Sequence, residues 1–274
     1  ILRRPKPNCV CLKKSMPTSR RYSDSGWIDS HCHLNELATA PAQLKEAKQA
    51  QIEYFIVPGT APQQWSDVIA WQSAHCAIAL GTHPWFVDPN EDQIGQLIVA
   101  LQQHEVVAIG EIGLDFYSNQ SQPRPHRALQ QRLFEAQLMI AKAHRLPVIV
   151  HSVKAHQQVI DTLRRLAIED GVVHAFIGSA ELAQQYIELG FHLGIGPLIL
   201  KSPKTRAALA QVPLSQMLLE TDAPFGNSHS AANPLLQILS VAQCVAEIKQ
   251  ISLAQLQHAT RGNTQRLFRL PADH

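Results

Sequence analysis

Trp27-Ile28-Asp29-Ser30-His31-Cys32-His33 is the stretch of sequence around which the rest of the chain is interpreted. Its short apolar entry is typical of a strand, and the two histidines stand one residue apart where that strand ends. Side chains alternate along a strand with period two, so both imidazoles are expected on one side, where they can bind one metal ion. Cys32 should face the opposite way, into the packing. A His-x-His pair also occurs on solvated surfaces. Whether this pair binds a metal therefore depends on the residues that the later strands supply.

Short apolar runs alternate with longer helical segments along the chain. We interpret eight runs as strands, at 27–28, 54–57, 77–80, 106–109, 147–150, 172–173, 191–194 and 217–219. Helices are expected at 41–50, 62–74, 91–103, 126–144, 156–167, 180–189, 203–210, 234–248 and 253–268. Unbroken apolar runs are typical of parallel strands that are buried on both faces. Eight strands, each followed by a helix, over about 250 residues predict an α/β fold of the (β/α)8 TIM-barrel type.

An open doubly wound sheet is the structural alternative. It is less favoured, because no GxGxxG motif follows the first strand. We expect residues 26–270 to form a single TIM-barrel domain.

Charge sets the first residues apart from that domain. Seven of the 24 Lys and Arg residues lie within residues 1–23, which contain no acidic residue, so the rest of the chain has 17 basic and 22 acidic side chains. We expect residues 1–25 to be a basic, disordered leader. A nucleic-acid-binding arm and an organelle-targeting segment are the alternatives for this leader.

Composition narrows the class of protein. Its 45% hydrophobic content is ordinary for a globular protein, and no apolar run reaches the length of a membrane span, so no membrane association is expected. The five cysteines are an odd number without a CxxC pair, which argues against a disulfide framework and against a zinc finger. A reducing, cytoplasmic location is predicted, and no obligate protein partner is inferred.

Residues of metal-binding type follow most of the predicted strands. They are His31, His33, His83, Glu111, Asp115, His151, His174, Glu220 and Asp222. In a TIM barrel the residues that carry the chemistry lie at the carboxyl ends of the strands. Any one of these histidines alone is more often a satisfied core residue than a ligand. However, four histidines and two carboxylates buried at one barrel mouth are costly unless cations pair with them, so we predict a centre for two divalent metal ions.

Several motifs at these positions occur in one order along the chain. They are His31-Cys32-His33, Gly110-Glu111-Ile112-Gly113-Leu114-Asp115, LPVIVHS at 146–152, His174-Ala175-Phe176 and LETDAP at 219–224. Together they resemble the TatD family of metal-dependent deoxyribonucleases, over about residues 27–268. The run at 171–179 is most similar to the YjjV-like branch of that family. The resemblance implies a metallo-dependent hydrolase domain with an amidohydrolase-like TIM barrel.

The resemblance also implies the roles of the individual residues. His31 and His33 would bind the first metal, His151 and His174 the second, and Glu111 would bridge the two. Asp222 would contact the first metal and the attacking water, so Asp222 and Glu111 are the predicted catalytic residues. The cofactors would be two divalent ions (Mg²⁺, Mn²⁺ or Zn²⁺). The substrate would be DNA, cleaved at its phosphodiester bonds, as by an exonuclease.

The sequence departs from the family pattern in two segments, and both departures bear on the substrate. Val153 stands where the family often has an arginine, which leaves Lys154 as the candidate for contacting a phosphate. Ala175 and Ile177 make the loop after the sixth strand more apolar. His83 is the other residue predicted to bind substrate, with loop packing as its alternative.

Four neighbouring residues have less definite roles. Trp85 and Phe86 are expected either to stack on a base or to cover the barrel rim. Asp115 is expected to structure its loop rather than to bind metal. Glu220 points either toward the site or into the packed interior.

Two other functions fit the same residues. A metal-dependent hydrolase of a small ester or C–N substrate would use the same ions. No lysine is placed to form a carbamylated bridge between the two metals, and Glu111 fills that place instead. This favours the nuclease over the hydrolase of a small substrate. A non-catalytic protein that binds nucleic acid through its basic leader is the third hypothesis, and the complete set of six ligands argues against it.

Overall fold

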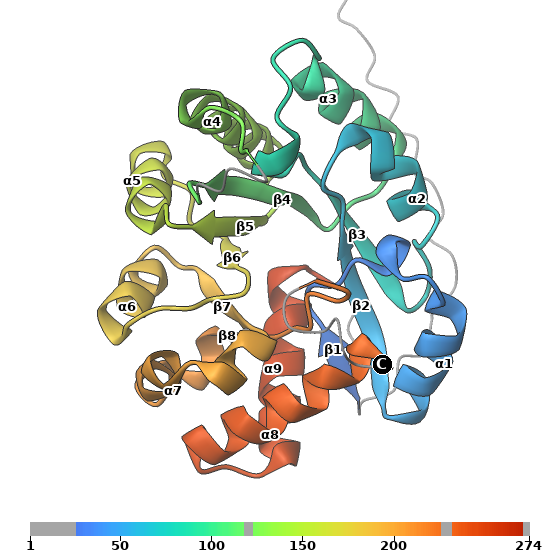
Figure 1. Ribbon diagram of the computed structural model, residues 1–274, viewed down its shortest axis with the longest axis vertical. Helices are drawn as coiled ribbons and strands as arrows, with labels where there is room; N and C mark the ends of the chain where they lie inside the picture. The colour runs from blue at the N-terminus through green and yellow to red at the C-terminus, as the bar shows by residue number, and fades with distance from the viewer. Residues whose placement is uncertain (1–25, 118–122, 226–231, 271–274) are drawn as a thin grey trace, which may run out of the picture.

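The computed structural model describes residues 26–117, 123–225 and 232–270, so the expectation for the leader at 1–25 lies outside the described residues. Eight parallel strands follow one another in chain order around a barrel, and helices surround them (Figure 1). The strands are β1 (Trp27–Asp29), β2 (Ile52–Pro58), β3 (Cys76–Leu80), β4 (Ala108–Asp115), β5 (Val148–Val153), β6 (Gly171–Val173), β7 (His192–Ile195) and β8 (Met217–Leu219). The predicted (β/α)8 barrel is confirmed.

The helices of the described residues agree with the sequence pattern except at one place. They are α1 (Ala40–Gln49), α2 (Trp65–Ile69), α3 (Gln93–Gln103), α4 (Arg127–His144), α5 (His156–Leu166), α6 (Ala180–Glu188), α7 (Pro203–Leu209), α8 (Gln237–Lys249) and α9 (Leu253–Leu267). The helix expected at 62–74 is shorter, because a 3-10 turn precedes α2 and Ser73 pairs with Cys76 after it. In this part of the chain, no helix is both long enough and apolar enough to cross a bilayer.

Two apolar layers hold the barrel. One fills its interior and consists of alternate strand residues such as Ile28, Ile149, Val172 and Leu218, joined by Phe268 after α9. The other lies between the strands and the surrounding helices. Because strand side chains alternate, the residues two positions beyond the interior ones face inward too, one layer nearer the carboxyl ends. His151, His174 and Glu220 occupy such positions.

Strands β4 and β5 extend further than the apolar runs indicate. Glu111 and Asp115 were expected after a strand but lie within β4, and His151 lies within β5. The reason is continued pairing, since Gly113 is opposite His151 and Asp115 is opposite Val153. A register shift between residues 109 and 112 places one extra residue in β4, and such a bulge re-aims the side chains beside it.

The residues just after β1 join the barrel to β8. The amide of Ser30 donates to the Leu219 carbonyl at 2.9 Å, and the amide of Asp222 donates to the His31 carbonyl at 2.9 Å. The buried Asp29 carboxylate accepts hydrogen bonds from the Thr221 amide at 3.0 Å and the Thr221 hydroxyl at 2.6 Å. We call these contacts the closing seam. They fix the backbone of the opening motif against that of Asp222.

Candidate metal centre

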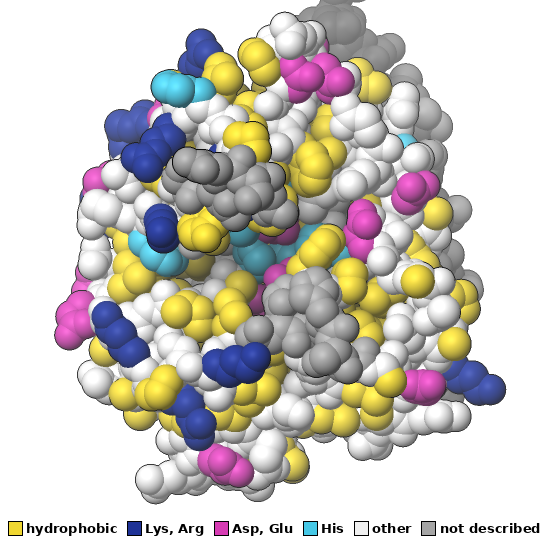
Figure 2. Space-filling model, in the orientation of Figure 1, with side chains coloured by type: hydrophobic (Ala, Val, Ile, Leu, Met, Phe, Trp, Pro, Cys, Tyr) yellow, Lys and Arg dark blue, Asp and Glu magenta, His cyan; other side chains and the backbone are white. Residues whose placement is uncertain are grey.

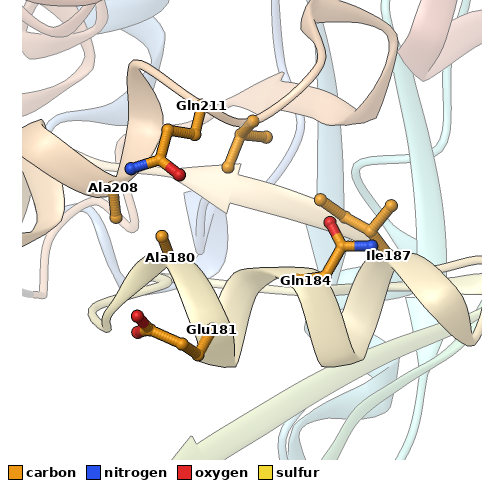
Figure 3. Close-up of a pocket in the computed structure, with 7 residues that line it drawn as sticks. Ala180, Glu181, Gln184, Ile187, Ala208 and Gln211 are labelled. Atoms are coloured by element: carbon orange, nitrogen blue, oxygen red, sulfur yellow. The ribbon is translucent and has the colours of Figure 1, made fainter.

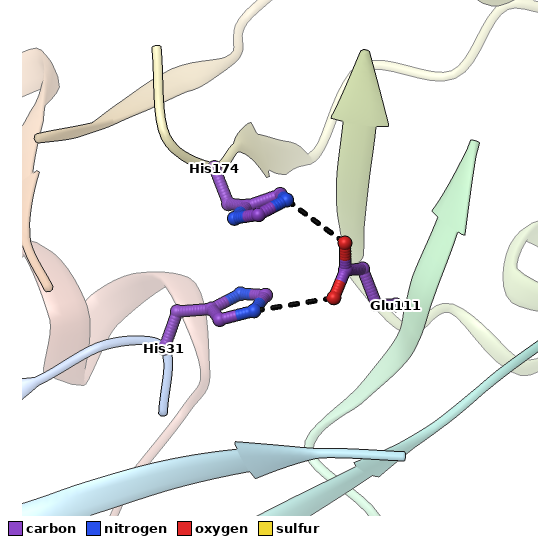
Figure 4. Close-up of side chains that lie close together, drawn as sticks. All are labelled: His31, Glu111 and His174. Carbon is purple, nitrogen blue, oxygen red and sulfur yellow. Dashed lines mark ion pairs between the residues drawn. The ribbon is translucent and has the colours of Figure 1, made fainter. Parts of the chain in front are cut away.

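Glu111 lies at the middle of the predicted cluster. Its Oε1 is 2.8 Å from His174 Nε2 and 3.0 Å from His151 Nδ1. Its Oε2 is 3.3 Å from His31 Nε2 and 3.5 Å from His33 Nε2. Figure 4 shows the carboxylate between the rings of His31 and His174. The two oxygens therefore face two different pairs of imidazoles, which is the arrangement that a carboxylate bridging two cations requires.

Asp222 completes the group around the first histidine pair. Its Oδ1 is 3.6 Å from His31 Nε2 and 3.5 Å from His33 Nε2. Those two nitrogens are only 3.1 Å apart. His33 Nδ1 lies 3.2 Å from the Pro58 carbonyl, so in the neutral ring Nδ1 carries the proton and Nε2 presents its lone pair. Imidazole lone pairs directed at one another fit a cation between them, so these residues suit a metal ion.

A second set of donors lies on the other side of Glu111. His151 Nδ1 and His174 Nε2 are 3.1 Å apart and both face Glu111 Oε1. Three groups of neighbouring donor atoms can each hold an ion. They are His31, Glu111 and His174; His31, His33 and Asp222; and His83, Glu111 and His151. The buried cluster is therefore consistent with a binuclear metal site, and the six predicted ligands all lie in it.

Charge in the metal-free cluster is shared between carboxylates and protonated histidines. Burial opposes ionisation of Glu111 and Asp222, but the surrounding histidines outweigh it and hold the pKa of both below the ordinary value. Burial likewise disfavours charge on His33, but hydrogen bonds to Asp222 and Glu111 raise its pKa to about 9. Divalent cations would replace these protons as partners of the carboxylates.

His83 joins the cluster in a different protonation form. Its Nδ1 accepts a hydrogen bond from the Trp85 amide at 3.2 Å, so its Nε2 must carry the proton in the neutral ring. That Nε2 is 3.3 Å from Glu111 Oε1. Burial, together with the charge of His151, lowers the pKa of His83 well below its ordinary value. Although His83 belongs to the third group of donor atoms, in this protonation form its Nε2 is a hydrogen-bond donor, and only the other tautomer could bind an ion there.

Exposed aromatic side chains surround the opening of the site. Trp85 and Phe86 lie in the 3-10 turn η3 (Pro84–Phe86), and Tyr117 and Phe225 follow β4 and β8. Each is between 41% and 44% exposed. Their rings contact the cluster or its neighbours, since His83 lies 5.2 Å from Trp85 and His33 lies 5.2 Å from Phe225, centroid to centroid. We call these four residues the aromatic rim.

The rim accounts for every exposed aromatic side chain in residues 26–117, 123–225 and 232–270. Figure 2 shows histidine and acidic side chains in a hollow of this face, with Lys and Arg mainly on its left half. Lys154 is exposed and its Nζ is 4.8 Å from the Tyr117 ring centroid, so it lies at the rim rather than against the proposed ligands.

Glu220 points into the packed interior. It is fully buried, and its Oε1 accepts a hydrogen bond from the Ala175 amide at 2.5 Å and lies 3.7 Å from His174 Nδ1. Gly194 leaves the room for this carboxylate, since a Cβ there would collide with Glu220 Oε2. Cys32 is buried in the outer core, as its place between two inward histidines predicts.

A separate hollow lies on the outside of the barrel between α6 and α7 (Figure 3). Its volume is about 290 Å³, and Glu181 is the one charged side chain among the residues that line it. It contains none of the cluster residues, so the chemistry of the molecule lies at the barrel mouth.

The model of the family described as TatD related DNase matches residues 28–269. The chain belongs to the TatD family. A curated TatD-family relative, the "Uncharacterized metal-dependent hydrolase YjjV" of Escherichia coli, is 34% identical over 89% of this chain and 98% of its own length. The crystal structure of the E. coli YjjV superimposes with a TM-score of 0.83 at 33% identity, over 91% of this chain and all of that one.

Two further TatD-family relatives have names that state an activity. "Deoxyribonuclease TATDN3" of Homo sapiens is 29% identical over 90% of this chain and 96% of its own length. "3'-5' ssDNA/RNA exonuclease TatD" of Edwardsiella piscicida is 31% identical over 84% of this chain and 93% of its own length. An E. coli phosphotriesterase homology protein shares the fold alone, with a TM-score of 0.65 at 14% identity. Family and cluster together make this chain a metal-dependent hydrolase of the TatD family.

Proposed function

We propose that this chain is a deoxyribonuclease that removes nucleotides from a DNA end by metal-dependent hydrolysis of phosphodiester bonds. The observation that carries the proposal is the place of Glu111, whose two oxygens face two separate pairs of imidazoles, with Asp222 beside one of them. Two cations held by these residues would suit hydrolysis at phosphorus, because they would offset the charge that develops on the phosphoryl oxygens.

The ions would be Mg²⁺, Mn²⁺ or Zn²⁺, held by His31, His33 and Asp222 on one side and by His151 and His174 on the other, with Glu111 between. When bound, they supply Lewis acidity that offsets charge on phosphoryl oxygens and lowers the pKa of a water molecule. Asp222 is ionised at neutral pH, because its histidine neighbours hold its pKa low despite burial. It is the group that orients the attacking water and accepts its proton.

His83 and Lys154 are the proposed substrate contacts. The Nε2–H of His83 lies 3.3 Å from Glu111 Oε1 in the cluster, where it can donate to a phosphoryl oxygen. Lys154 lies at the rim, within reach of a phosphate further along the strand. The aromatic rim supports a single-stranded end, because bases that are free of pairing stack on exposed rings. The names of the two TatD relatives support the same substrate class.

The test uses the full chain with single-stranded DNA labelled at its 5′ or 3′ end. With Mg²⁺, Mn²⁺ or Zn²⁺ we expect stepwise release of nucleotides, and EDTA should abolish it. Glu111→Gln and Asp222→Asn should each reduce kcat by at least about a hundredfold. Glu188→Gln, the same change of a carboxylate to an amide at an exposed position of α6, is the matched control. Cleavage of a simple aryl ester or phosphodiester without release of nucleotides would identify the small-substrate hydrolase instead.

Two other expectations remain predictions. We propose that residues 26–270 are the complete catalytic unit. The described cysteines Cys32, Cys76 and Cys244 are buried free thiols. Their state is compatible with the reducing, cytoplasmic location that the sequence predicts.

A further inference from the structure

We propose that Asp115 is a positioning residue that holds the imidazole of His151 and the indole of Trp85 through one carboxylate. It would fix which nitrogen of His151 is offered to a metal, and at the same time the place of one ring of the aromatic rim. This inference rests on the proposed assignment of His151 as a ligand, and the experiments below separate the two.

The Asp115 carboxylate is held from several directions. Its Oδ2 accepts hydrogen bonds from Trp85 Nε1 at 2.5 Å and from Arg124 Nε at 3.2 Å. Its Oδ1 accepts from the Tyr117 amide at 2.8 Å. The Gln130 side chain bonds both the amide and the carbonyl of Asp115, at 2.8 and 3.0 Å. At 2% exposure the carboxylate has little freedom to move, so it can orient a side chain that lies beside its Oδ2.

The side chain beside Asp115 Oδ2 is the imidazole of His151. The His151 Nδ1 faces Glu111 Oε1 and His174 Nε2, so it is Nδ1 that a metal would engage. The neutral ring must then carry its proton on Nε2. Among the residues that the structure describes, this Nε2 is buried without a hydrogen-bond partner, and Asp115 Oδ2 is 3.7 Å away. A shift of about an ångström or less makes this contact a hydrogen bond. A carboxylate in this position selects the tautomer and makes the ligand more basic.

Trp85 is the second group that the carboxylate holds. Its Nε1–H bond to Asp115 fixes the ring, and the Arg124 guanidinium lies 3.9 Å from the ring centroid on one face. A base that stacks at the rim would therefore contact the Trp85 ring. The position of this ring is set by the Asp115 carboxylate, which also orients His151. Loss of the Asp115 charge should weaken both metal binding and substrate binding, whereas loss of the indole N–H should weaken substrate binding only.

The first experiment compares Asp115→Asn with Trp85→Phe in the full chain. Binding of Zn²⁺ is titrated at buffered free Zn²⁺, and KM is measured for a single-stranded oligonucleotide. Asp115→Asn should bind the first ion as the unchanged protein does and the second about 10- to 100-fold more weakly. It should also have a raised KM. Trp85→Phe should keep both metal affinities and show only the raised KM. Two unaltered metal affinities in Asp115→Asn would overturn the proposal.

The second experiment needs no altered Asp115 and therefore stands even if Asp115→Asn does not fold. The protein is labelled with ¹⁵N-histidine, and the His151 signals are assigned with His151→Gln. With Zn²⁺ bound, we expect the proton on His151 Nε2 and a Zn²⁺-dependent shift of Nδ1. A proton on Nδ1 would overturn the positioning role. His151 nitrogens that do not respond to Zn²⁺ would instead refute the ligand assignment, and with it this part of the proposed function.

Discussion

His33 is a residue at which a proton and a metal ion compete directly. Burial lowers its pKa, but Asp222 and Glu111 outweigh burial and raise it to about 9 in the metal-free site. At pH 7 the ring is therefore protonated and must lose its proton to bind metal. We expect the affinity for the ion that His33 would bind to rise at least about tenfold per pH unit from 7 to 9, because His33 must release its proton over this range.

Calorimetry in buffers of different ionisation enthalpy checks this prediction. It should show at least one proton released per chain at pH 7 and fewer at pH 9.5. An affinity that does not change between pH 7 and pH 9 would contradict the proposed competition.

Gly194 and Gly196 form a matched pair of positions beside Glu220. A methyl group at Gly194 would collide with Glu220 Oε2, whereas at Gly196 it would lie 3.5 Å from Glu220 Cγ, an ordinary contact. Gly194→Ala should therefore lower the free energy of unfolding by about 1–3 kcal/mol. Gly196→Ala should change it by less than about 1 kcal/mol. Chemical denaturation of the metal-free proteins measures both, and equal losses would show that Gly194 is not needed to make room for Glu220.

Asp29 holds the end of β1 against the residues after β8 in the closing seam. Its carboxylate accepts three hydrogen bonds, from the amides of His31 and Thr221 and from the Thr221 hydroxyl. Asp29→Ala leaves these donors buried without an acceptor and should cost about 3 kcal/mol of the free energy of unfolding. Asp29→Asn keeps an amide oxygen for the two amides and should cost less than half as much. Thermal unfolding ranks the variants, and the reverse order would refute this role for Asp29.

The pH dependence of this contact follows from the burial of Asp29, which raises its pKa to about 7 from an ordinary value near 3.8. A raised pKa means that the folded state binds the proton more tightly than the unfolded state does. The contribution of Asp29 to stability is therefore fully present below about pH 4 and is lost as pH rises through 7.

The order of the strands could be predicted from sequence, but the ends of some of them could not. Apolar runs identify β8 to the residue, because polar Gln216 and Glu220 flank it. At β4 the run 106–109 stops at Gly110, whereas the strand continues to Asp115. Its pairing with β5 is made by backbone groups and so does not depend on side-chain hydrophobicity. Glu111 was singled out from the sequence and lies in the cluster, but the bulge beside it has no signal in the pattern of apolar residues.

The six predicted ligands could be singled out from the sequence because each comes shortly after, or directly ends, a buried apolar run, and their role as ligands stays a prediction. Tyr117 and Phe225 were missed as members of the rim, although each lies within two residues of a motif. Tyr117 follows the motif that ends at Asp115, and Phe225 follows the one that ends at Pro224. Whether an aromatic side chain after a strand is exposed depends on tertiary packing. The proton position on His83 was also beyond sequence, since it is set by the direction of the Trp85 amide.

The aromatic rim makes one face of the whole molecule different from the rest. Trp85→Ala should raise KM for a single-stranded oligonucleotide by about 5- to 100-fold, because stacking on one base contributes about 1–3 kcal/mol. The kcat for release of a nucleotide should change much less. Leu253→Ala is the control, since Leu253 is 43% exposed but lies at the start of α9. An equal change in KM in the two variants would exclude the rim from substrate binding.

The proposed catalytic unit can be separated from residues 1–25 by deletion. We expect the shortened chain to keep its kcat and its metal content, because all six proposed ligands lie between residues 31 and 222. The slope of log KM for DNA against log salt should also stay the same, which would exclude the leader as a DNA-binding arm. A smaller slope after deletion would show that the basic residues of the leader contact phosphates.

The closing seam has a consequence for how the barrel folds. The backbone of His31 is bonded to that of Asp222 across the last joint of the ring, and their side chains belong to one donor group. A slip of one residue at this joint would turn both histidines of the opening motif outward and bring Cys32 inward. Such a misclosed chain would lack the first metal site. A metal ion present during folding would therefore stabilise the correctly closed ring relative to its slipped alternatives.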